Sequence, residues 1–150
     1  MVALPLEYVI STTLSVGAIY KFEAYEFLST NIPHHFIVVA IDGNDNFLLV
    51  CTSQQEKKEE YFDRKKIDYK CLVWIKPDSE NGLTKDSFVN CTNTPFLLTK
   101  EDLVRKCKEG VLTYTGMVSY NHYDQIRTGI MASYENDLPE EILKHECDDQ

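Results

Sequence analysis

Two apolar runs separated by a short turn sequence constrain the fold of this chain more than any other feature. The runs cover residues 36–41 and 47–52, and the five residues between them read Asp-Gly-Asn-Asp-Asn. Glycine, asparagine and aspartate tolerate the positive φ angles that tight turns between paired strands require. The pattern therefore predicts an antiparallel β-hairpin.

Further strand signals fill the first two-thirds of the chain. Residues 17–22 alternate apolar with small or polar residues after a glycine, and residues 69–75 form another run that ends at Lys-Pro-Asp. Residues 87–91 predict a short strand. Because several of these runs are apolar almost throughout, we expect a sheet that curls on itself or is covered on both faces.

The last third of the chain changes to helical patterns. Thr99 can cap a helix that has two acidic residues in its first turn. Residues 119–132 predict a second helix with an apolar stripe, and residues 138–143 a short third one that has proline at its start. Strands followed by helices predict an α+β fold, most simply a small β-barrel with helices on its side.

Length and composition are those of one globular domain. The chain has 150 residues, of which 43% are hydrophobic and 26% are charged. Its first ten residues lack a basic signal region, and no apolar run reaches the roughly 20 residues of a membrane span, so the expected localisation is cytoplasmic without membrane contact. The five cysteines form no Cys-x-x-Cys pair and are expected to be buried, reduced thiols.

The net charge of −9 opposes nucleic-acid binding at long range, so an RNA site would need a local basic patch. The concentrated basic stretch is residues 57–66, which begins with Lys57 and Lys58 and is interleaved with acidic residues. Such interleaving is more typical of a solvated charged loop than of a nucleic-acid site, and we expect a loop here.

His34 and His35 stand at the start of the first hairpin run. A histidine near neutral pH can both accept and donate a proton, which cleavage of a phosphodiester by an internal 2′-hydroxyl requires twice. Consecutive strand residues face opposite sides, so we expect at most one of the two to point into a given site. The alternative is that one histidine caps a strand edge and the other lies on the surface.

Thr52, Ser53 and Gln54 end the second run. Hydroxyls and backbone amides at the end of a strand can hold a phosphate or an oxyanion, and Lys57 or Lys58 could neutralise charge that develops there. If the two runs pair as a hairpin, these groups come close to the histidines. The alternative is an ordinary polar turn.

Other chemistry has less support in the sequence. A zinc site from His34, His35, His122 and a cysteine lacks a typical ligand spacing, so we expect no metal and no cofactor. A hydrolase that uses Cys51 and His35 needs an exposed thiolate, whereas Cys51 follows an apolar run that favours burial. No P-loop, dinucleotide-binding or zinc-protease motif is present.

The order of these elements resembles the PemK/MazF-like ribonuclease toxins. The likeness rests on the glycine-started strand at residues 17–20, on Pro33 before a Phe-Ile-Val-Val strand, and on Leu-Leu-Val-Cys-Thr-Ser at residues 48–53. Gly-Met-Val at residues 116–118, before the second predicted helix, is similar to the family's C-terminal region. The resemblance covers residues 15 to 135.

The resemblance implies an SH3-like barrel, often dimeric, that cleaves RNA without a metal and is held inactive by an antitoxin. On this basis residues 15–98 would form the barrel and residues 99–145 the helical part of a single domain. Thr52 and Ser53 match the active-site hydroxyl element of the family. RNA, an antitoxin protein or RNA, and a second copy of the chain are the implied partners.

The chain departs from the family at His34 and His35, which stand where the family usually has an arginine. Either a histidine has taken an acid or base role while Lys57 or Lys58 supplies positive charge, or the fold is kept and the nuclease activity is lost. The first alternative predicts a toxin-type endoribonuclease. The second predicts a non-catalytic binding or adaptor module in regulation or defence.

Overall fold

The hairpin predicted from the sequence lies in the middle of the sheet. The computed structural model describes residues 5–24, 28, 30–53, 55–133, 138 and 143. In it β2 (His34–Asp42) and β3 (Asp45–Thr52) pair as antiparallel strands, as the apolar runs predicted. The turn between them consists of Gly43, with φ of +60°, and Asn44. It is shorter than the five-residue turn sequence because its outer residues already pair across the two strands.

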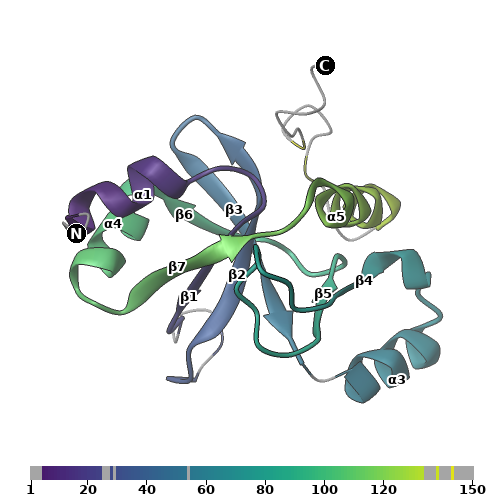
Figure 1. Cartoon of the computed structure of the whole chain (residues 1–150). Coiled ribbons are helices and arrows are strands. Elements are labelled where there is room, and N and C mark those ends of the chain that lie inside the picture. The colour runs from purple at the N-terminus through teal and green to yellow at the C-terminus, as the bar shows by residue number, and fades with distance from the viewer. Residues whose placement is uncertain are drawn as a thin grey trace.

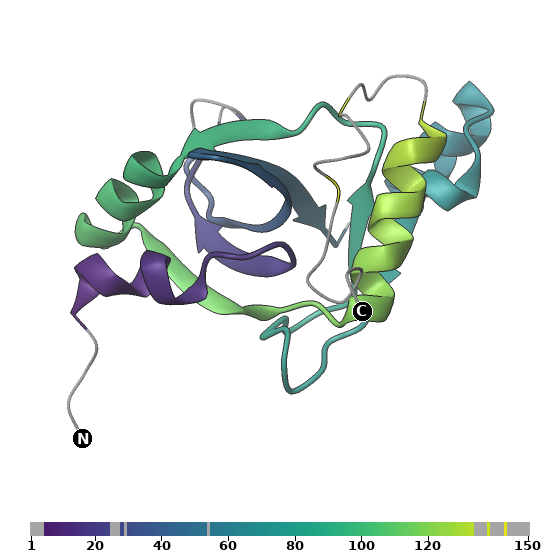
Figure 2. The same ribbon diagram turned by 90° about the horizontal axis from the view of Figure 1, so that it is seen from above.

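Seven strands form an antiparallel sheet in the order β4-β5-β3-β2-β1-β7, with β6 also paired to β3. The remaining strands are β1 (Ala18–Phe22), β4 (Leu72–Ile75), β5 (Ser87–Asn90), β6 (Phe96–Thr99) and β7 (Leu112–Met117). Since β2 occupies one side of β3, β6 and β5 share the other side, β6 along the first half and β5 at the end. The sheet is therefore strongly curved and coils around itself, as Figure 2 shows from above. The predicted α+β class and small barrel-like form are confirmed.

Helices cover this sheet at both ends (Figure 1). They are α1 (Leu6–Thr13), α3 (Gln55–Lys65), the 3-10 helix η1 (Tyr69–Cys71), α4 (Lys100–Lys108) and α5 (Tyr120–Ala132). Helices α1 and α4 lie side by side at one end, and α3 and α5 lie at the other. None of the described helices is long and apolar enough to cross a membrane.

Both faces of the central strands are buried, which explains why their sequences are apolar almost throughout. Ile37 and Val39 of β2 belong to a core that includes the inner residues of α5, while Phe36 and Val38 belong to a second core beneath α1 and α4. An extra residue at Val39 interrupts the register between β2 and β3. Its carbonyl accepts a hydrogen bond of 2.8 Å from the buried Tyr123 hydroxyl, which ties α5 to the sheet.

The two predicted helices of the last third are confirmed. Thr99 caps α4 through a capping box with Asp102, in which each side chain accepts a hydrogen bond from the backbone of the other residue. Ser119 caps α5 by accepting from the backbone N–H of His122. The third predicted helix, residues 138–143, lies outside the described residues except at its two ends.

Several segments differ from the sequence-based expectation. Residues 57–65 of the charged stretch belong to a helix, α3, rather than to a loop, because its lysines and glutamates favour helix and Phe62 anchors it in the core. Residues 69–71 form η1 instead of the start of a strand. Strand β7 lies within the part expected to be helical, since it completes the sheet by pairing with β1.

Candidate functional site

A cavity of about 330 Å³ opens at the end of the hairpin away from its turn. The pairing of β2 with β3 ends at Phe36 and Val50, while the next residues of β3 pair with β5. Residues of the chain between β4 and β5 close the space that opens beyond the end of the β2–β3 pairing. The lining comes from four segments: Lys21, residues 32–35, residues 51–53, and residues 83–85 with Ser87.

His35 lies opposite Lys21 in the pairing of β1 with β2. Partial burial lowers the pKa of the His35 imidazole below its ordinary 6.5, and the nearby Lys21 ammonium and His34 lower it further. All three disfavour the charged form of the ring. The His35 imidazole is therefore neutral at pH 7, which is the form that accepts a proton.

His34 lines the cavity as well as His35. Alternation along a strand predicted that at most one of them would, but the cavity lies at the end of β2 and residues 32–35 all contribute to its lining. The Nδ1 atom of His34 lies 2.7 Å from the carbonyl oxygen of Ile32. Because a carbonyl only accepts, Nδ1 is the donor in this bond, and Nε2 is left to exchange a proton with a ligand.

Thr52 and Ser53 line the same cavity, so the structure brings the predicted hydroxyls together with the predicted histidines. Gln54 lies outside the described residues. Cys51 also reaches the cavity wall, but burial raises the pKa of its thiol to about 12. A thiol with that pKa stays protonated at neutral pH, which argues against Cys51 as a nucleophile.

The cations of the cavity are not those that the sequence indicated. Lys57 and Lys58 lie on α3, and neither lines the cavity, whereas Lys21 and Lys85 do. Lys21 is the exposed position of an otherwise buried strand, a signal that could have been noticed. Lys85 stands in a connection without regular structure and gave no local signal.

The connection that carries Lys85 is held in place by buried polar contacts. The side chain of Asn81 is buried, donates to the carbonyl of Lys76 at 2.9 Å, and accepts from the backbone N–H of Leu83 at 2.9 Å. The N–H of Met117 on β7 donates to the carbonyl of Glu80 at 2.8 Å. These bonds hold residues 80–83 beside β7, directly before Thr84 and Lys85 of the cavity wall.

The zinc arrangement considered from the sequence does not assemble. His122 lies on α5, and its Nδ1 is 3.2 Å from the Ser119 hydroxyl at the start of that helix. Within the described part of the chain, no group of three or more His, Cys, Asp or Glu side chains is placed to hold a metal ion.

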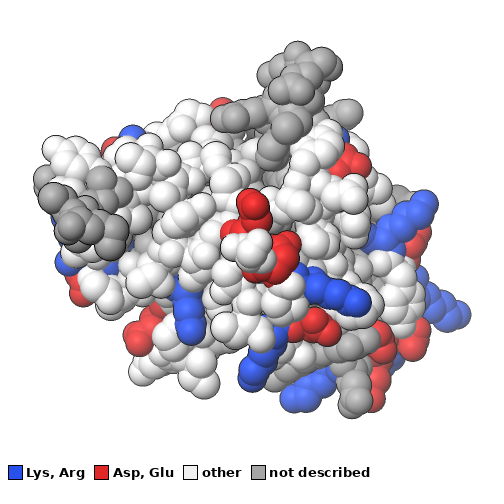
Figure 3. Space-filling model, in the orientation of Figure 1, with Lys and Arg blue, Asp and Glu red and all other residues white. Residues whose placement is uncertain are grey.

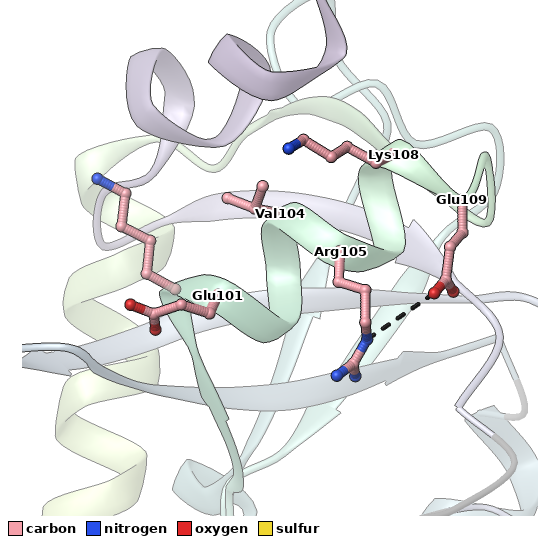
Figure 4. Close-up of a pocket in the computed structure, with 6 residues that line it drawn as sticks. Glu101, Val104, Arg105, Lys108 and Glu109 are labelled. Carbon is pink, nitrogen blue, oxygen red and sulfur yellow. Dashed lines mark ion pairs between the residues drawn. The ribbon is translucent and has the colours of Figure 1, made fainter.

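A second hollow, of about 620 Å³, lies on the outer face of α4. Figure 4 shows its side chains spreading from this one helix, with Arg105 directed towards Glu109. Arg105 is also 3.5 Å from Asp102. The lining of this hollow contains no imidazole and no hydroxyl, so it lacks the combination of groups found in the cavity at the hairpin end.

The lysine opposite His35 makes the titration of that ring testable. We expect Lys21→Gln to raise the pKa of His35 towards 6.5, because a cation that disfavours the charged ring is removed, while burial still holds the pKa below that value. The measurement is an NMR titration of the ring C–H signals from about pH 4 to about pH 8. Lys57→Gln is the control, since it removes the same charge from α3. An unchanged or lower pKa in Lys21→Gln would contradict the assigned contact.

Comparison with known proteins places the fold but not the family. No protein-family model matches the chain. No curated protein matches it either. A solved structure described as an endoribonuclease from Mycobacterial species superposes with a TM-score of 0.51 and 15% sequence identity, and the match covers 85% of this chain and 96% of that one. At this identity the likeness is one of fold.

Proposed function

We propose that this chain is a toxin-type endoribonuclease that cleaves single-stranded RNA by acid–base catalysis without a metal ion. The observation that carries the proposal is the cavity at the hairpin end, where two imidazoles, four hydroxyls and two ammonium groups from four segments line one space. Likeness in fold to an endoribonuclease supports it.

In the proposed reaction the substrate supplies its own nucleophile, the 2′-hydroxyl next to the scissile phosphate. Neutral His35 accepts the hydroxyl proton as the 2′-oxygen attacks phosphorus, and the bond from phosphorus to the 5′-oxygen breaks. His34, protonated on Nε2, donates a proton to the departing 5′-oxygen. The products are a 2′,3′-cyclic phosphate and a 5′-hydroxyl end.

The remaining polar groups of the cavity stabilise the negative charge that grows on the phosphate. Thr52 and Ser53 donate hydrogen bonds to its non-bridging oxygens, and the Lys21 and Lys85 ammonium groups offset its charge. These lysines also answer the objection from net charge. A chain with a net charge of −9 needs a local cluster of cations to hold RNA, and Lys21 and Lys85 supply one at the site itself.

RNA cleavage by the purified protein tests the proposal. We expect a mixed-sequence single-stranded RNA to be cut in the presence of EDTA, and a DNA strand of the same sequence to stay intact because it lacks the 2′-hydroxyl. Mass spectrometry of the products should find 2′,3′-cyclic phosphate ends. Failure to cut any RNA, or equal cutting of the DNA, would refute the proposed reaction.

The proposal includes the partners that the family resemblance implies, namely an antitoxin protein or RNA and a second copy of the chain. The competing function is a non-catalytic binding or adaptor module on the same fold. The two functions make different demands on the cavity. A ribonuclease requires a neutral imidazole beside hydroxyl groups, whereas a non-catalytic adaptor does not. We therefore favour the enzyme.

A further inference from the structure

Trp74, the only tryptophan of the chain, is exposed although it lies in a strand of the sheet. It lies on β4, at one edge of the sheet, with 46% of its surface accessible. Its ring is nearly parallel to that of Phe88 on β5, with the centroids 6.0 Å apart and an interplanar angle of 11°. Phe88 itself is 4% exposed, so a buried ring supports the exposed one.

The exposed indole belongs to a row of side chains that begins in the candidate site. Thr52 of β3 pairs with Phe88 of β5, and Phe88 pairs with Trp74 of β4. Residues directly opposite in antiparallel strands lie on the same face of a sheet. Each step between strands is about 4.8 Å, which puts Trp74 about 10 Å from Thr52.

Positive charge accompanies this aromatic surface. The Nζ atom of Lys76 lies 4.6 Å from the centre of the Trp74 ring. Figure 3 shows Lys and Arg side chains gathered around the end of the molecule that carries α3 and the β4–β5 pair, with acidic side chains among them. An aromatic face beside cations suits a strand that alternates bases with phosphates.

We propose that Trp74 is a stacking platform for a nucleobase of the single-stranded RNA whose scissile phosphate is held near Thr52. The inference rests on the proposed ribonuclease function and adds a substrate-binding subsite to it. The stack with Phe88 orients the indole before RNA binds, so little side-chain freedom is lost on binding. Where the base stacks on the face that Lys76 covers, the flexible lysine moves aside and its ammonium pairs with a neighbouring phosphate.

A nucleic-acid ligand fits this surface better than a second copy of the chain does. An exposed edge strand can pair with another copy, but Lys76 and Pro77 follow β4 directly, and such residues oppose edge-to-edge pairing. Stacking depends little on which base is present. We therefore expect the Trp74 subsite to strengthen RNA binding without selecting a sequence.

Tryptophan fluorescence tests the subsite directly, because Trp74 is its only source. The probe is a single-stranded DNA oligonucleotide, which the proposed reaction does not cut, compared with an abasic strand of equal length and charge. We expect the DNA to quench the fluorescence and the abasic strand to leave it unchanged. Equal responses to both strands would overturn the subsite, whether or not any variant folds.

Kinetics of RNA cleavage give the second measurement. We expect Trp74→Ala to raise KM about 5- to 100-fold at unchanged kcat, since a stacked base contributes mainly to binding, and Trp74→Phe to recover part of the loss. Tyr8→Ala is the matched control, because Tyr8 is 52% exposed on α1. If the wild type cuts RNA and Trp74→Ala has the same KM, the subsite is overturned and the proposed enzyme is not. This holds even if the variant has a different oligomeric state. A wild type that neither cuts nor binds RNA would refute both.

Discussion

RNA cleavage by the His35→Gln protein is expected to be about 10²- to 10⁴-fold slower than by the wild type, the usual contribution of a general base. Glutamine is close to histidine in size and polarity but takes up no proton at neutral pH. Because His35 is only half-buried at a strand end, the fold should be kept. Initial rates on a labelled RNA, with thermal unfolding curves of both proteins, provide the measurement.

His122→Gln is the control for this experiment, since His122 lies on α5 and is absent from the cavity lining. The pH profile of kcat/KM adds a second check. The wild-type rate should fall as pH drops through the lowered pKa of His35, because protonation removes the base, and this acidic limb should be lost in His35→Gln. A His35→Gln protein that is folded and fully active would exclude His35 as the base.

The Gly82→Ala protein is expected to lose about 3 kcal/mol of its free energy of unfolding, from left-handed backbone strain and overpacking together. Gly82 has φ of +69°, and a Cβ atom there would overlap the backbone carbonyl of Thr115 on β7. Backbone cannot move aside as a side chain does, so the connection would shift. Urea-induced unfolding measures the loss.

Gly43→Ala is the matched control, because Gly43 has a similar φ of +60° but no atom within 4 Å of the added Cβ. It should cost about 1 kcal/mol, which is the backbone strain alone. Gly82→Ala should also slow RNA cleavage, since residues 83–85 wall the cavity, whereas Gly43→Ala should not. Equal destabilisation by both substitutions would show that the close approach at Thr115 is unimportant.

Local patterns were enough to predict the hairpin and two helices. Turn residues between apolar runs predicted β2 and β3, a capping threonine predicted α4, and an apolar stripe predicted α5. The same reasoning failed at α3, where interleaved charges are typical of a loop but Phe62 anchors the segment in the core as a helix. It also missed β6 and β7, short strands that exist because the sheet offers them partners.

The candidate site also has a part that the sequence predicted and a part that depends on packing between distant segments. The hairpin register alone brings residues 34–35 close to residues 52–53, because paired strands that share a turn also share their far ends. Nothing local joins Lys21 to Lys85, which are distant in sequence. They reach one cavity because the pairing of β2 with β3 ends at Phe36 and Val50, and the connection before β5 lines the space beyond it.

By itself the sequence determined the α+β class, the central hairpin and the histidine and hydroxyl groups at its end, since these depend on neighbours in the chain. The tertiary structure decided which cations face the cavity, that the Cys51 thiol is held protonated, and that Trp74 stands in a row with Thr52. Those features depend on strand order and burial, which are set by packing between segments far apart in the chain.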